Sequence, residues 1–256
     1  MDAVTRVPMP VNEPVLDYAP ETSERAQVQL RLAEIAAERH ELTCTIGGDQ
    51  KLGGGEEIDV VEPHRHSHVL GTMRSATTAD AQAAIDAATE AAPGWRALSY
   101  DDRAAIFLTA AELLSGPWRQ TLNAATVLGQ SKSVVQAEID SACELIDFWR
   151  FNVLFGREIL AEQPIRNTPG VWNRSDHRPL EGFVYAITPF NFTAIAANLP
   201  TAPALMGNTV LWKPASTSIL SNYYIMQILI EAGMPPGVVN FVPGRGGDVG
   251  DPVFAS

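Results

Sequence analysis

The sequence is poor in cysteine. Among 256 residues only Cys44 and Cys143 occur, far apart and without a Cys-x-x-Cys pair. This spacing predicts neither a disulfide framework nor a zinc knuckle. Two unlinked thiols, buried or at the surface, are the interpretation that the usual burial of free cysteine favours.

Positive charge and long apolar runs are also scarce. The chain has 18 Lys and Arg against 30 Asp and Glu, a formal net charge of −12. Such a field repels phosphate backbones, so we expect no nucleic-acid partner. No stretch approaches the roughly 18 uninterrupted apolar residues of a membrane span. With 46% hydrophobic and 19% charged residues, the composition is ordinary for a soluble globular fold, and we expect no membrane partner.

The first residues do not resemble a targeting segment. Met1–Arg6 contains Asp2 and has no apolar stretch behind a basic cluster. Glu13, Asp17 and Glu21 follow, whereas transit peptides are poor in acids. We therefore expect a cytoplasmic protein.

The first sixty residues predict an arm followed by a small hairpin. A proline-rich lead precedes an amphipathic segment with Val28, Leu32 and Ile35 on one helical face. Ile58–Val61 and Val69–Gly71 then predict two strands of a hairpin.

Three histidines alternate within that hairpin, at positions 64, 66 and 68. On a strand they would share one face, which is a metal-like pattern. No carboxylate or cysteine stands at a matching spacing to complete a ligand set. The pattern favours an exposed hairpin tip over a metal site, and we expect no metal.

A row of helices is predicted from Thr77 onward. Thr77 and Asp80 resemble a capping box, and Pro93-Gly94 is expected to stop the first helix. Asp101 is expected to cap the second helix, which Gly116-Pro117 would end.

The longest helix is expected from about residue 132 to residue 155. Apolar residues recur along it in steps of four and three, which predicts a buried stripe. The stripe consists of Val135, Ile139, Ala142, Ile146, Trp149 and Val153. Glu144 lies on another face among small and aromatic neighbours, so it is either a paired or solvated acid or a residue that faces a site.

The last third of the chain predicts a β-α-β-α-β unit. Phe183–Thr188, Thr209–Lys213 and Val238–Val242 are apolar runs typical of parallel strands buried on both faces. Helical stretches over about 193–206 and 217–232 separate them, near the roughly 30-residue spacing of such units. Ligands of parallel sheets bind beyond the carboxyl ends of the strands, so we expect the three following loops to cluster there.

The loop after the third strand is rich in glycine but does not complete a dinucleotide fingerprint. Gly244 and Gly246 would require a third glycine at position 249, where Val249 stands. Glycine here serves either close approach of a ligand or a turn of the chain.

Three motifs in order resemble the aldehyde dehydrogenase superfamily. They are Ile187-Thr188-Pro189-Phe190-Asn191-Phe192, the run from Ala204 to Pro214 and the run from Glu231 to Asn240. Phe190 stands where most members carry tryptophan. At Phe190 and at residues 136–140 and 148–152, the chain resembles the Δ1-pyrroline-5-carboxylate (L-glutamate γ-semialdehyde) dehydrogenase branch. The likeness covers nearly the whole chain.

The resemblance implies an α/β, aldehyde-dehydrogenase-like fold that stops before the catalytic domain. Residues 1–160 would form the arm and the helical part of the cofactor-binding domain. Residues 161–180 would be part of an oligomerisation β-flap, so the complete protein would be a homo-oligomer. Residues 181–256 would be an incomplete Rossmann-type core with a partial parallel sheet.

The resemblance also assigns site residues. Asn191 would help to bind the oxyanion formed during aldehyde oxidation, since its amide has two N–H donors; from the residues alone it could instead cap the following helix. Thr188, Pro189 and Phe190 would lie beside the nicotinamide ribose. Glu144 would neighbour the aldehyde pocket.

Lys213 would bind the adenosine ribose, although a solvated lysine at the strand end is the alternative. Ser216 stands near where many members carry a ribose-binding glutamate, which weakens the distinction between NAD and NADP; the branch generally uses NAD. Gly246 and Gly250 are the expected cofactor-binding glycines.

The implied chemistry needs a cysteine nucleophile and a general-base glutamate, and neither family motif occurs here. Cys44, in the expected arm, and Cys143, in a helix, are not replacements. The resemblance therefore implies an inactive fragment of an NAD-dependent enzyme of proline degradation. The intact form would oxidise the small-molecule aldehyde L-glutamate γ-semialdehyde to glutamate. The alternative is a non-enzymatic nucleotide-binding or subunit-interaction module. A different Rossmann oxidoreductase is disfavoured because no Tyr-x-x-x-Lys pair occurs.

Overall fold

A five-stranded sheet forms the centre of the structure, a computed structural model that describes residues 6–256. Residues 1–5, which contribute to the expectation about targeting, lie outside the described residues. Three strands of the sheet are parallel neighbours: β6 (Val184–Ile187), β7 (Val210–Lys213) and β8 (Val239–Phe241). The predicted β-α-β-α-β unit is therefore confirmed.

Two short strands extend this sheet beyond β8. β2 (Cys44–Ile46) pairs antiparallel with both β8 and β3 (Asp49–Lys51), which gives the order β3-β2-β8-β7-β6. All of β2 is buried. The expectation that Cys44 lies in an arm was wrong, because a strand of three residues is too short to show an alternating pattern in the sequence.

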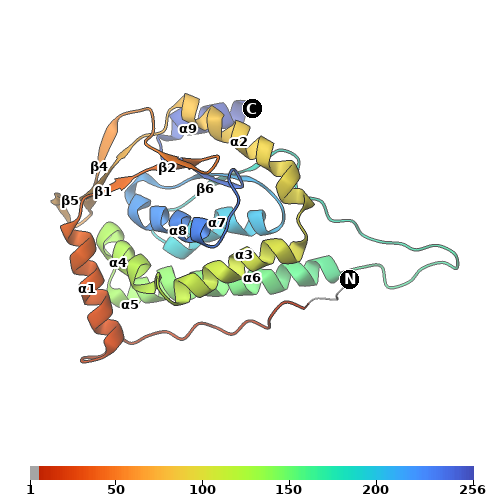
Figure 1. Cartoon of the computed structure of the whole chain (residues 1–256), viewed down its shortest axis with the longest axis horizontal. Coiled ribbons are helices and arrows are strands. Elements are labelled where there is room, and N and C mark those ends of the chain that lie inside the picture. Colours follow the sequence, from red (N-terminus) through yellow and green to blue (C-terminus); the bar gives the residue numbers. More distant parts are fainter. Residues whose placement is uncertain (1–5) are drawn as a thin grey trace.

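Helices cover both faces of the sheet, as Figure 1 shows. Leu211 packs against the helices of one face, whereas its neighbours Val210 and Trp212 belong to the larger apolar cluster on the other. This alternation follows from the two-residue period of a strand. The helices are α2 (Thr78–Ala97) and α9 (Gly246–Ala255) on the first face, and α7 (Thr193–Leu205) and α8 (Ile219–Glu231) on the second.

The capping box that begins α2 is confirmed, but its predicted end is not. Thr77 accepts a hydrogen bond from the Asp80 amide, and the Asp80 carboxylate accepts one from the Thr77 amide. Pro93 lies inside the helix, which continues to Ala97. Trp95 explains the continuation: its ring is 2% exposed and its indole N–H donates to the carbonyl of Ala204. Tertiary packing thus outweighs the local preference of proline.

The next helices differ from the prediction only at their ends. α3 (Tyr100–Ser115) is capped by Ser99, whose hydroxyl accepts from the Asp102 amide at 3.1 Å, so the assignment of the cap to Asp101 was wrong. Asp101 lies in the first turn instead. α4 (Arg119–Gln130) begins after Trp118.

The long helical run is interrupted by a π-helical segment. It consists of α5 (Val134–Ala137), a π-helix called η1 (Glu138–Cys143) and α6 (Glu144–Ala161). A π turn adds a residue and rotates the faces before and after it relative to one another. The predicted stripe is therefore buried only from Ala142 onward, whereas Val135 and Ile139 are exposed.

A second, smaller sheet contains the predicted hairpin. β4 (Glu57–Glu62) pairs antiparallel with β5 (Arg65–Arg74), and β1 (His40–Leu42) adds to β5 in parallel. His64 and His66 are exposed at the tip, as expected. Within residues 6–256 no three His, Cys, Asp or Glu side chains are grouped as metal ligands. In the same residues no helix is both long and apolar enough to cross a membrane.

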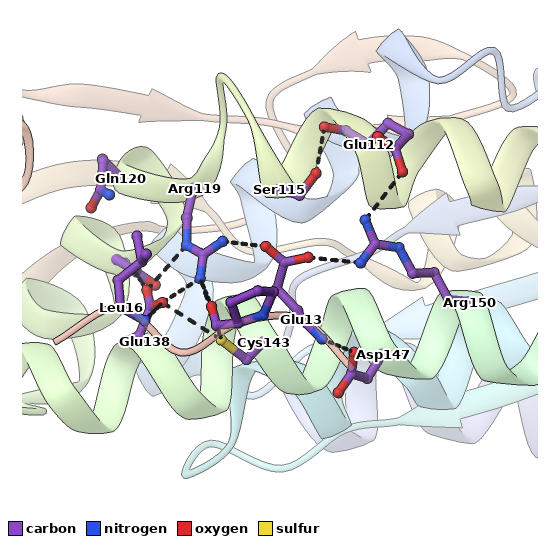
Figure 2. Close-up of polar contacts among 12 residues, drawn as sticks. Glu13, Leu16, Glu112, Ser115, Arg119, Gln120, Glu138, Cys143, Asp147 and Arg150 are labelled. Carbon is purple, nitrogen blue, oxygen red and sulfur yellow. Dashed lines mark hydrogen bonds and ion pairs between the residues drawn. The ribbon is translucent and has the colours of Figure 1, made fainter. Parts of the chain in front are cut away.

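The N-terminal arm (residues 6–20) lies along the helices and leads into α1 (Ser23–Ala37), where Val28 and Ile35 are buried as predicted (Figure 1). Figure 2 shows what holds it: Glu13 bridges Arg119, at 2.5 Å, and Arg150, at 2.7 Å. Arg119 also pairs with the fully buried Glu138. The arm is thus attached by charged groups as well as by apolar contacts.

Glu138 is the central acceptor of this network. It receives hydrogen bonds from the Leu16 amide at 2.9 Å, the Tyr18 hydroxyl at 2.7 Å and Asn123 at 2.8 Å. Burial alone would raise the pKa of Glu138, but the hydrogen bonds from Arg119 and the arm hold it below its usual range. The carboxylate therefore stays charged in the interior.

Residues 162–182 project away from the body without forming a strand in this chain (Figure 1). Ile165, Val171 and Trp172 on this projection are exposed, Trp172 by 77%. The segment presents apolar side chains to solvent instead of to its own core.

Strand β6 is the open edge of the central sheet, so the expectation that it is buried on both faces was wrong. Val184 and Tyr185 are half-buried and Ile187 is 54% exposed. No described strand pairs with its outer side. β7 and β8, which have neighbours on both sides, are buried as predicted.

We predict that Glu138→Gln releases the arm. Breaking a buried ion pair costs about 3 kcal/mol, and each 1.4 kcal/mol is roughly a factor of ten. The Leu16 amide should therefore exchange its hydrogen about 100-fold faster, measured by hydrogen–deuterium exchange on peptides from residues 8–20.

Glu112→Gln is the control, because it removes only the exposed partner of Arg150. The folded pKa of Glu138 is depressed, so its stabilisation is complete at neutral pH and is lost only as pH falls through that pKa. The unaltered arm should loosen in acid, below the ordinary range of a glutamate. Equal hydrogen exchange in both variants at neutral pH would contradict the claim that Glu138 holds the arm in place.

We predict that this 256-residue chain, expressed alone, aggregates and binds the dye ANS. An open edge strand offers unpaired N–H and C=O groups to other chains, and the apolar side chains around β6 remain wet. Light scattering and ANS fluorescence measure both effects. A monodisperse monomer with a cooperative melt and a low ANS signal would contradict the prediction.

Candidate functional site

The loops after the three parallel strands meet at one edge of the sheet. Ile187 is in register with Lys213, and Trp212 with Phe241. The Thr188 amide continues the ladder, donating to the carbonyl of Lys213 at 3.2 Å. The predicted clustering of these loops is therefore confirmed.

A cavity of about 500 Å³ opens beside the first two loops. It lies between the hairpin tip, the end of α4 and the turn that follows β6. Its lining residues are Pro63, Gln130, Lys132, Phe190, Asn191 and Thr217. Phe190 supplies aromatic surface, and four of the six lining residues carry polar side chains that can orient a small molecule.

Asn191 lies exposed at this cavity and does not cap α7. The N-cap position belongs to Phe192, which has no capping side chain. The first amides of the helix donate instead to Asp140 of η1, from Thr193 at 3.1 Å and from Ala194 at 3.3 Å. The capping alternative for Asn191 was therefore wrong, and its amide is available to a ligand.

The neighbours of Asn191 are placed differently from one another. Thr188 is buried, and its hydroxyl accepts a hydrogen bond from the indole N–H of Trp212 at 2.9 Å. Pro189 is half-buried, and Phe190 is 61% exposed over the cavity. The Thr188 hydroxyl thus ties two strands together, and Phe190 provides the free surface.

Lys213 ends β7 without an acidic partner. Its ammonium donates to the carbonyl of Pro214 at 3.3 Å and forms no ion pair in the described part of the chain. Burial lowers the pKa of this half-buried lysine. Ser216 is exposed at the start of a short 3-10 turn, η2 (Ser216–Ser218). The loop after β7 therefore offers the unpaired ammonium of Lys213 and the exposed hydroxyl of Ser216.

The glycine-rich loop after β8 leads into α9. Gly246 is the first residue of that helix, and a Cβ there would meet nothing within 4 Å. A Cβ on Gly244 would lie 2.7 Å from the buried Val249, so Gly244 serves packing. Gly250 faces the hydroxyl of Tyr185. Val249 breaks the dinucleotide fingerprint because its side chain belongs to the core.

The chain matches the model of the aldehyde dehydrogenase family over residues 51–256. It belongs to this family.

Similar proteins of the family share one name. A Δ1-pyrroline-5-carboxylate dehydrogenase of Agaricus bisporus is 48% identical over 94% of this chain and 44% of its own length. The mitochondrial enzyme of Mus musculus is 45% identical over 96% of the chain and 43% of its own length. The chain therefore spans less than half the length of these relatives.

The fold agrees with solved structures. The Δ-pyrroline-5-carboxylate dehydrogenase of Mycobacterium tuberculosis superposes with a TM-score of 0.98 at 61% identity, over 100% of this chain and 47% of the other. A structure of that enzyme holds NAD, at 62% identity and a TM-score of 0.96 over 98% of this chain and 47% of the other. The α/β aldehyde dehydrogenase fold is thus confirmed, in a chain that covers about half of it.

Neither thiol of this aldehyde dehydrogenase chain suits a nucleophile. Cys44 and Cys143 are buried, and burial raises the pKa of each to about 12. Cys143 lies against Arg119 and Glu138 in the arm network, away from the cavity. The prediction that neither replaces the family cysteine agrees with this burial.

Glu144 is half-buried at the start of α6 and is not among the described residues that line the cavity. Burial and the negative charge of Asp140 raise its pKa. Its role beside an aldehyde stays a prediction.

Sequence reasoning missed three residues of the site: Gln130, Lys132 and Asp140. Asp140 is 3% exposed and forms an ion pair with Lys132, whose ammonium also lies 4.5 Å from the centre of the Phe192 ring. The available signal was an acid between apolar helix positions, Ile139 and Ala142. Its partners are backbone amides more than fifty residues away, which no local pattern identifies.

Proposed function

We propose that this chain is the cofactor-binding half of an NAD-dependent dehydrogenase. The complete enzyme would oxidise L-glutamate γ-semialdehyde, formed from Δ1-pyrroline-5-carboxylate, to L-glutamate in proline degradation. The observation that carries the proposal is the uncommitted amide of Asn191 at a cavity on the carboxyl edge of the parallel strands. The names of the relatives support the substrate.

Asn191 fits the stabilisation of transient negative charge. A carbonyl carbon under attack develops an oxyanion, and fixed N–H donors lower the energy of that state. The Asn191 side chain offers two such donors without a permanent charge. Because Asp140 accepts the first amides of α7, the Asn191 side chain is not used as a helix cap.

The residues at the sheet edge also fit NAD. The unpaired ammonium of Lys213 suits ribose hydroxyls, and the open space above Gly246 admits a ligand near the backbone of α9. Thr188, Pro189 and Phe190 would border the nicotinamide end, Ser216 and Gly250 the other end. NAD supplies the hydride acceptor. NAD-bound structures of relatives support NAD over NADP.

The nucleophile and the general base belong to the part of the relatives that this chain does not span. In the completed enzyme these two groups would act on the aldehyde at the cavity beside Asn191. Glu144 would border the aldehyde, where an acid with a raised pKa costs less to bury. Alone, this chain would give no turnover.

Assembly and compartment complete the proposal. The exposed apolar side chains of the projection support a homo-oligomer of the complete protein. This projection also supports the division into residues 1–160, 161–180 and 181–256. A cytoplasmic location stays a prediction, because several relatives are named mitochondrial.

The first test compares this chain with the completed enzyme. By completed enzyme we mean this chain joined to the part of the 61% identical relative that it does not span. We expect NADH formation from glutamate γ-semialdehyde only in the completed enzyme. Turnover by the chain alone that survives alanine at Cys44 and Cys143 would contradict the proposal, and NAD binding without any turnover after completion would favour a non-enzymatic module.

The second test separates the roles of Asn191 and Lys213 in the completed enzyme. Asn191→Ala should lower kcat roughly 10²–10³-fold with little change in NAD affinity, because one oxyanion donor is lost. Lys213→Ala should weaken NAD binding about tenfold with a smaller change in kcat, the scale of one charged hydrogen bond. Steady-state kinetics and NAD titration measure both. The reverse pattern would exchange the two assignments.

A further inference from the structure

Two side chains, one from α4 and one from η1, hold the backbone of the turn that carries Asn191. Gln130, the last residue of α4, donates to the carbonyl of Phe190 at 3.0 Å and accepts from the Thr193 hydroxyl at 2.8 Å. Asp140 accepts the backbone amides of Thr193 and Ala194. The backbone is therefore fixed on both sides of Asn191.

Asp140 is suited to this task by its place in the π-helix. It is buried and lies at the N-terminus of α7, where a negative charge is stabilised by the amides of the first turn. Lys132 balances the charge as an ion pair. A buried carboxylate with this set of partners has little freedom to move.

Asn191 itself lacks such restraint. Its side chain is exposed at the cavity, and no hydrogen bond to it occurs within residues 6–256. The backbone of the turn thus sets the point and the direction from which the Asn191 side chain reaches into the cavity. Displacing a reacting or stabilising group by about 1 Å lowers a rate by roughly 100-fold, so the rigidity of the turn matters for catalysis.

We propose that Asp140 and Gln130 are positioning residues that fix the Asn191 amide where the oxyanion forms. The inference rests on the proposed function. Neither side chain needs to touch the substrate: Asp140 holds the amides that follow Asn191, and Gln130 holds the carbonyl that precedes it.

The test uses the completed enzyme with Asp140→Asn, Asp140→Ala and Gln130→Ala. We expect kcat to fall roughly 10- to 100-fold in Asp140→Ala and less in the other two, with NAD affinity within about threefold of the unaltered enzyme. Gln130→Ala leaves the ion pair and the helix cap intact, so it remains informative if Asp140→Ala does not fold.

A double-mutant cycle with Asn191→Ala distinguishes positioning from a general structural role. If Asp140 and Gln130 act through Asn191, their substitution in the Asn191→Ala background should cost no more than about threefold in kcat. A structural role would multiply the losses. Multiplied losses, or unchanged kcat in all three single variants, would overturn the inference while the proposed function stands.

Asp147→Asn is the matched control. Asp147 lies on the same helical run but accepts from Asn12 and the Glu13 amide of the arm. Its substitution should change kcat less than about twofold on the additivity of distant sites. A loss equal to that of Asp140→Asn would assign the effect to the helix as a whole and overturn the inference. An unaltered completed enzyme without aldehyde turnover would overturn the proposed function and this inference together.

Discussion

Two buried carboxylates within one π-helix join parts of the chain that are distant in sequence. Glu138 accepts the amide of Leu16 and the guanidinium of Arg119, whereas Asp140, two residues later, accepts the first amides of α7 (Figure 2 shows the Glu138 side). The widened turn lets both acids of η1 face the interior. The arm on one side and the Asn191 turn on the other therefore depend on the same six residues.

Acids occupy these positions because apolar side chains cannot accept hydrogen bonds. The arm and the N-terminus of α7 both bring backbone N–H groups into the interior, and each buried N–H needs an acceptor. A hydrophobic replacement of a buried ion pair can match its stability, but it would leave these amides without partners. The network thus defines where two segments lie more than how firmly the whole molecule folds.

Sequence patterns predicted correctly those features of the fold that depend on neighbouring residues. The capping box at Thr77, the hairpin and the three parallel strands follow from patterns within a few residues, and the sheet-edge rule predicted that the loops after the strands meet at one edge. The continuation of α2 past Pro93, the pairing of β2 with β8 and the role of Asp140 depend on contacts far along the chain. The spacing of apolar residues does not reveal such distant partners. The π-helix also rotates the buried face of the helical run, so a regular spacing no longer predicts which residues are buried.

The order of the strands explains why the site is open on one side. β2 pairs with β8 in the antiparallel sense, so the inner strands have neighbours and β6 alone among the parallel strands has a free side. A further parallel strand beside β6 would create a point where the strand order reverses, the place at which such sheets bind ligands. Asn191 follows β6 at that point. Gln130 and Asp140 hold the backbone on either side of Asn191, and the exposed Asn191 side chain remains free at the cavity for the groups that react.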